Sequence, residues 1–92
     1  MTISRAKRRE ERRPLVAESV STALVEVVLD LLEIFDLAWH DCYGDRFPPE
    51  HVVHDVLLVG GGDLGELIKA VRLGVTDWRD LRVVADAVRP EQ

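Results

Sequence analysis

Apolar residues between Pro14 and Cys42 recur every three or four positions, which is the spacing of one face of an α-helix. They form two neighbouring seams. The first seam contains Val20, Leu24, Val27, Leu31, Ile34 and Ala38, and the second contains Val25, Val28, Leu32, Phe35, Trp39 and Cys42. At about 100° per residue, the two seams together cover roughly 200° of the helix circumference. The sequence therefore predicts one long helix over about 15–43 that has too much apolar surface for a small chain to cover.

The rest of the chain predicts three shorter helices. The first, over about 49–60, has helical apolar spacing, although its valine content leaves a strand open. The second begins at Asp63, which has capping-box spacing with Glu66, and it ends near Gly74. The third follows Thr76, a possible cap, and its apolar face is made by Trp78, Leu81, Ala85 and Val88. We therefore expect an all-α fold, a small helical bundle with one long N-terminal helix followed by three shorter helices, in a dimer.

Three short helices can cover only one of the two seams of the long helix. Because apolar burial is the main driving force of association, we expect the other seam to bind a second copy of the chain, in an antiparallel homodimer, or a different protein. The favoured function is a small non-enzymatic protein–protein interaction module of a regulatory, inhibitory or adaptor kind. The expected interaction surface consists of Val20, Leu24, Val27, Leu31, Ile34, Phe35 and Trp39.

Charge is distributed unevenly along the 92 residues, whose net charge is −5. Residues 1–13 contain six basic and two acidic side chains, whereas residues 14–92 contain six basic and fifteen acidic ones. Proline is well accepted in the first turn of a helix, so Pro14 marks the boundary. We expect a flexible basic arm over 1–13 and a single helical domain over 14–92. Such an arm contacts phosphates or an acidic partner, or it simply stays solvated.

A second functional hypothesis rests on the run from Ala70 to Thr76, which resembles the first helix and turn of a DNA-binding helix-turn-helix. The resemblance implies a dimeric DNA-binding regulator in which residues 63–89 read the DNA and the basic arm contacts phosphates. Asp77 and Asp80 depart from this pattern, since carboxylates at these positions repel phosphates. The possible nucleic-acid contacts are Arg5, Lys7, Arg8, Arg9, Arg12, Arg13, Arg79 and Arg82.

Signals for a cofactor, a metal or catalysis are weak. Gly60, Gly62 and Gly65 have the spacing of a dinucleotide-binding turn, but the sheet that such a turn requires does not fit in 92 residues. Four residues of types that ligate zinc occur around the first turn region: His40, Cys42, His51 and His54. They lack the paired spacing of structural zinc sites, and no nucleophile accompanies them. We expect no enzyme activity, no cofactor and no metal, although metal binding by these four residues stays open.

Composition supports one small folded domain, with 47% hydrophobic residues and an acidic balance. A single cysteine excludes an intrachain disulfide. Carboxylates interrupt the longest apolar stretches, so we expect no membrane span, and no apolar segment typical of a secretory signal follows the basic N-terminus. The predicted location is cytoplasmic. Arginine greatly outnumbers lysine, which indicates a GC-rich, bacterial genome.

Overall fold

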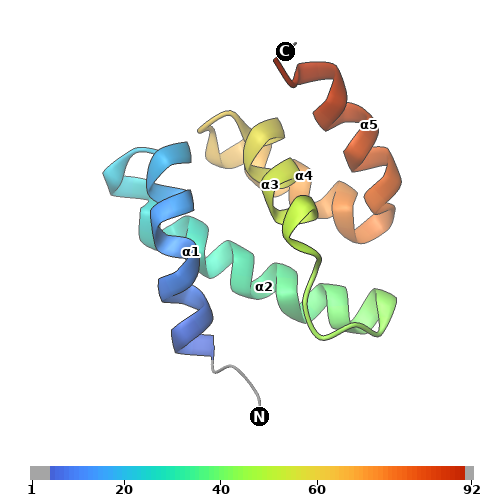
Figure 1. Cartoon of the computed structure of the whole chain (residues 1–92), viewed down its shortest axis with the longest axis horizontal. Coiled ribbons are helices and arrows are strands. Elements are labelled where there is room, and N and C mark those ends of the chain that lie inside the picture. The colour runs from blue at the N-terminus through green and yellow to red at the C-terminus, as the bar shows by residue number, and fades with distance from the viewer. Residues whose placement is uncertain (1–4, 91–92) are drawn as a thin grey trace.

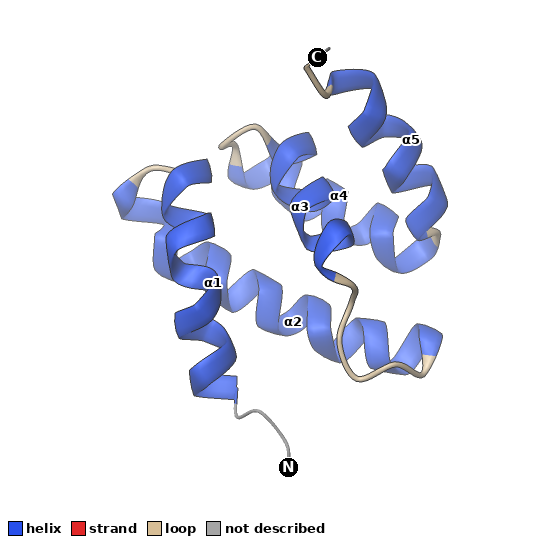
Figure 2. Ribbon diagram, viewed as in Figure 1, coloured by secondary structure: helices blue, strands red, loops and turns tan. Residues whose placement is uncertain are grey.

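The computed structural model describes residues 5–90, and this part of the chain contains helices but no strand (Figure 2). The elements are α1 (Arg5–Ser19), the short 3-10 helix η1 (Thr22–Leu24), α2 (Val25–Tyr43), α3 (Glu50–Gly60), α4 (Leu64–Thr76) and α5 (Trp78–Val88). The predicted all-α class is therefore confirmed, and the strand that the valines of α3 left open does not form. The dimeric state stays a prediction.

The predicted single helix over about 15–43 is wrong, because the chain leaves the helix after Ser19 and resumes an α-helix at Val25. Ser21 has an extended backbone (φ −65°, ψ 155°), and η1 follows it. Serine and threonine side chains bond to the nearby backbone in non-helical conformations, so the pair Ser21 and Thr22 favours a turn. The break lets α1 fold back and cross α2 (Figure 1).

Residues 5–13 of the predicted flexible arm instead form the first part of α1, which packs on α2. Residues 1–4 of that arm lie outside the described residues. Pro14 does not begin a helix but lies inside α1. Proline removes one backbone hydrogen bond there, while its fixed φ remains compatible with helical geometry. The physical reason for the ordered helix is a set of contacts between its arginines and acidic residues of α2, described below.

The second apolar seam of α2 forms the centre of the core. Val28, Leu32, Phe35 and Trp39 are all at most 3% exposed, and the rings of Phe35 and Trp39 meet edge to face. Helices α3 and α4 pack against each other and against α5, and α4 also packs on α2 (Figure 1). One seam of α2 is thus covered within the chain. The hydrophobic effect makes this burial the main stabilising contribution.

Tyr43 joins the end of α2 to the junction of α4 and α5. Its hydroxyl group donates a hydrogen bond to the Gly74 carbonyl oxygen (2.9 Å) and accepts one from the Trp78 backbone N–H (3.2 Å). It therefore satisfies one backbone group at the end of α4 and one at the start of α5.

The prediction that Thr76 caps the last helix is wrong. Asp77 caps α5 by accepting a hydrogen bond from the Arg79 N–H.

Glycines make the turn between α3 and α4. A Cβ atom on Gly60 would lie only 2.3 Å from the Leu67 side chain, so the two helices approach closely there. Gly61 and Gly62 have positive φ, which glycine adopts without strain. Asp63 then caps α4 by accepting from the Glu66 N–H at 2.9 Å, as the capping-box spacing predicts. These glycines therefore connect two helices and do not follow a strand, as a dinucleotide-binding turn would.

A buried carboxylate fixes α5 to α3. Asp55 is 1% exposed, and its oxygens lie 2.8 Å from Arg89 and 3.4 Å from Arg82. Burying a carboxylate is costly unless it is paired, and two guanidinium groups supply that pairing. Both arginines come from the last two turns of α5 or just after it, so they anchor the C-terminal part of the described chain.

Candidate functional site

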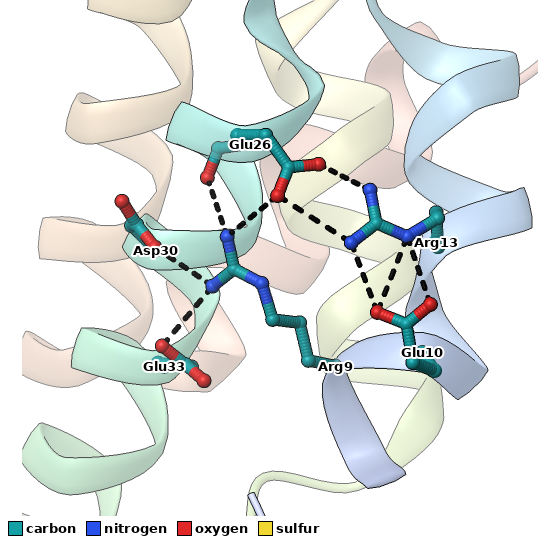
Figure 3. A network of polar contacts seen from close by, with 6 residues as sticks. All are labelled: Arg9, Glu10, Arg13, Glu26, Asp30 and Glu33. Atoms are coloured by element: carbon teal, nitrogen blue, oxygen red, sulfur yellow. Dashed lines mark hydrogen bonds and ion pairs between the residues drawn. The ribbon is translucent and has the colours of Figure 1, made fainter. Parts of the chain in front are cut away.

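Arginines of α1 meet carboxylates of α2 in a polar network at the crossing of the two helices (Figure 3). The network contains Arg9, Glu10, Arg13, Glu26, Asp30 and Glu33. Arg9 bonds to Asp30 at 2.7 Å and to Glu33 at 3.2 Å. Arg13 lies between Glu10 of its own helix and Glu26 of α2. Glu26, Asp30 and Glu33 would face water if α2 were an isolated helix. Here their charges are matched by the arginines of α1.

The network favours the ionised form of two of its carboxylates, Glu26 and Glu10. Hydrogen bonds from Arg13, and then from Arg9, keep the pKa of Glu26 below its ordinary value. Arg13 also lowers the pKa of Glu10. Hydrogen bonding to the charged form of a carboxyl group favours that form. The contact between α1 and α2 is therefore an attraction between full charges at neutral pH.

A more buried pair lies further along the same crossing. Arg12 donates to both oxygens of Asp36, at 2.9 and 2.8 Å, in the two-pronged geometry that suits a guanidinium group and a carboxylate. The Arg12 side chain is only 6% exposed and that of Asp36 is 14% exposed. Because both groups are largely removed from water, we regard this pair as the main polar anchor of α1.

These contacts bear on the predicted nucleic-acid interface. Most of its residues form ion pairs with carboxylates of this chain: Arg8, Arg9, Arg12, Arg13, Arg79 and Arg82. The resemblance places the turn at Gly74, but Gly74 lies inside α4 without a positive φ, and the corner between α4 and α5 is at Asp77. On α5, however, Val83 and Val88 are 68% and 53% exposed, so its solvent-facing side is partly apolar. Nucleic-acid binding stays a prediction, and neither the paired arginines nor the partly apolar face of α5 adds support for it.

Beside the crossing, α1, α2 and the α2–α3 loop enclose a pocket of about 410 Å³. Five arginines contribute to its lining, together with the apolar side chains of Leu37 and Phe47. Four of the arginines come from α1 and the fifth, Arg46, comes from the loop. Sequence reasoning missed this pocket, because the loop residues carry no periodic signal that links them to α1.

The structure divides the predicted interaction surface into core and exposed residues. Val20, Phe35 and Trp39 are at most 8% exposed, so they belong to the core and cannot contact a partner without unfolding. Leu24 and Leu31 are half-buried. Val27 and Ile34 remain 44% and 59% exposed. We call the part of the first seam that lies on α2 the α2 stripe, which consists of Val27, Leu31, Ile34 and Ala38.

The four candidate metal ligands are not brought together. His40, Cys42, His51 and His54 are all exposed, and His51 lies edge-on against the ring of Trp78. Within residues 5–90 no three histidine, cysteine or carboxylate side chains are grouped closely enough to hold a metal ion. The same range contains no helix with the length and apolarity that crossing a bilayer requires.

Comparisons of the chain with protein-family models, with curated proteins and with solved structures find no match. The surface features that can contact another molecule are the α2 stripe, the α1–α2 crossing and the pocket beside it.

Proposed function

We propose that this chain is a small non-enzymatic interaction module that binds a second copy of itself through the α2 stripe. The observation that supports this proposal is the exposure of Val27 and Ile34, 44% and 59%, at positions two helical turns apart on one face. Leu31 lies between them and is half-buried. Single exposed aliphatic residues are ordinary, but a row of them along one helix face is typical of a contact surface.

A second copy is a suitable partner because a stripe of aliphatic residues is complementary to itself. Two copies of α2 packed antiparallel about a two-fold axis would place each stripe in the groove of the other. Asp30 and Asp41 are the acidic residues beside the stripe, and the first of them is matched by a charge within the chain. The Asp30 carboxylate is already bound by Arg9 at 2.7 Å, which reduces the repulsion between two acidic helices.

The size of the α2 stripe sets the expected affinity of the dimer. A standard protein interface buries about 800 Å² on each partner, and four aliphatic side chains supply only the centre of such an area. We therefore expect a reversible dimer with a dissociation constant in roughly the micromolar range. Reversible self-association suits a regulatory module whose surface can also be released to another protein.

Light scattering over about a hundredfold dilution tests the proposal. The mass should fall from twice the chain mass of 10.4 kDa towards a single chain mass. Ile34→Asp should give a monomer at all concentrations, because a carboxylate would be buried in the apolar interface. The matched control is Val83→Asp, which places the same charge at an exposed aliphatic position of α5 and should dimerise as the unaltered chain does.

A chain that is monomeric at every concentration would refute the proposal. So would an Ile34→Asp variant with the mass and helical circular dichroism of the unaltered protein. Loss of the dimer in Val83→Asp alone would move the contact to α5 and would equally contradict binding through the α2 stripe.

A further inference from the structure

The pocket between α1, α2 and the α2–α3 loop has the size of a ligand site. Its volume of about 410 Å³ falls within the range of roughly 300–1,000 Å³ that small-molecule sites occupy. Its α2 residues do not belong to the α2 stripe, so the inference below does not rest on self-association. The pocket is also distinct in charge from the rest of this acidic chain.

Five arginines and two carboxylates line the pocket. Asp36 binds both terminal nitrogens of Arg12, and Glu33 bonds to Arg9 at 3.2 Å. The two carboxylates therefore offset two of the arginines. The five arginines of the lining exceed its two carboxylates by three positive charges, in a protein whose net charge is −5. A concave site with a surplus of one sign of charge attracts ligands of the opposite sign.

Arg8 is the most informative of these residues. Its side chain is only 14% exposed, yet within residues 5–90 it makes no hydrogen bond, and its Nε is buried without a partner. The nearest carboxylate oxygens, of Asp36 and Glu50, lie 4.0 and 3.9 Å away, which is too far for hydrogen bonds. A guanidinium group carries five N–H donors, and leaving the buried Nε–H of Arg8 without an acceptor is costly. Arg8 is thus prepared to bind an anionic acceptor that enters the pocket.

Apolar side chains form the remaining wall. The Arg8 guanidinium lies over the ring of Phe47, with its central carbon 3.7 Å from the ring centroid, so the ring holds the cation in place. Leu37, which is 50% exposed, also lines the pocket. The Glu50 side chain is 71% exposed and can turn into solvent when a stronger acceptor arrives. The lining therefore matches a ligand with an anionic head and an apolar body.

We propose that this pocket binds a small amphipathic anion, in which a carboxylate or a phosphate monoester is attached to a short apolar body. Arg8 donates to the anionic head, Arg46 and Arg5 add positive charge at the entrance, and Leu37 and Phe47 cover the apolar body. Guanidinium groups match both carboxylate and phosphate in planar, two-pronged geometry, so the head chemistry is shared by the two ligand classes.

Isothermal titration calorimetry with octanoate and octyl phosphate tests the proposal. We expect one anion per chain and an affinity at least tenfold higher than for octanol, which has the same chain without a charge. Inorganic phosphate, which lacks the apolar body, should also bind at least tenfold more weakly. The ratio between the two anions identifies the preferred head group. Equal binding of octanol and the anions, or no binding of either anion, would overturn the proposal.

Three variants locate the site. Arg8→Gln should weaken octyl phosphate binding at least tenfold, and Arg46→Gln should weaken it several-fold. Arg72→Gln is the matched control, because it removes a positive charge from an exposed position of α4 outside the pocket and should leave binding unchanged. Arg46 is exposed, so its variant remains informative if Arg8→Gln does not fold. Binding that is insensitive to Arg46→Gln and Arg8→Gln, or equally sensitive to Arg72→Gln, would refute the assignment.

Discussion

Replacing Arg12 by methionine tests whether α1 is fixed to α2 by charge. Arg12 is 6% exposed and donates two hydrogen bonds of 2.9 and 2.8 Å to Asp36. Removing one partner of a buried ion pair costs about 3–5 kcal/mol, because the remaining charge is left uncompensated. Asp36 keeps 14% exposure and Arg8 lies 4.0 Å away, so part of the loss is offset. We therefore expect Arg12→Met to lower the free energy of unfolding by about 2–3 kcal/mol.

A double variant separates the loss of the pair from the loss of packing. Arg12→Met combined with Asp36→Leu removes both charges and leaves no buried carboxylate. Apolar replacement of a whole buried pair is often close to neutral, so we expect the double variant to recover to within about 1 kcal/mol of the unaltered protein. Arg12→Lys keeps the charge but not the two-pronged geometry, and its stability should fall between that of Arg12→Met and that of the unaltered protein.

Urea unfolding followed by circular dichroism measures all three variants against the unaltered chain, at a concentration where light scattering shows one oligomeric state. The opposing expectation comes from a flexible arm over 1–13. In that case Arg12 would be solvated, and its replacement would change the unfolding free energy by no more than about 0.5 kcal/mol. Such a small effect for Arg12→Met would refute the docking of α1 by this pair.

Two further predictions concern the helix contacts. Gly60→Ala would place a Cβ atom 2.3 Å from the Leu67 side chain and 3.3 Å from the Leu67 Cα. The overpacking should cost about 1–3 kcal/mol, which exceeds the helix-propensity gain of about 1 kcal/mol, so we expect the variant to be less stable than the unaltered protein. An unchanged melting temperature would contradict this. Arg13 and Arg9 depress the folded-state pKa of Glu26. The contribution of Glu26 to the free energy of unfolding is therefore fully present above its unfolded-state pKa, and it is lost as the pH falls through its folded-state pKa. Urea unfolding between about pH 5 and 2.5 should show a shallower acid loss for Glu26→Gln, and parallel curves would count against the network.

Local sequence patterns determined much of this fold. Gly44 ends α2 with a left-handed backbone, next to the end of the helix predicted over about 15–43, and Asp63 caps α4 through the Glu66 N–H, as the capping-box spacing predicts. The second seam is buried from Val25 to Trp39, which agrees with the expectation that one of the two seams is covered within the chain. These features depend on interactions within a few residues, such as caps, glycine conformations and a repeat of 3.6, so they can be read from a short window.

The first helix shows where such patterns fail. Apolar residues keep helical spacing on both sides of Ser21 and Thr22, so periodicity alone does not reveal the break between α1 and α2. The charge pattern is the feature of the sequence that indicates the break. Basic residues in 5–13 and acidic residues in 26–36 both recur every three or four positions, and they match only after the chain reverses direction.

Tertiary structure therefore decided everything that depends on residues far apart in the sequence. Arg9 and Asp30 are 21 positions apart, and Arg12 and Asp36 are 24 apart, yet each pair makes direct hydrogen bonds. The same reversal brings Arg8 against Phe47 of the α2–α3 loop and so creates the pocket. The sequence by itself determined that the chain is helical, where α2 ends and where α4 begins, because these features follow from local geometry. Which charges are paired, which remain for a ligand, and which aliphatic residues stay exposed follow only from how the helices pack.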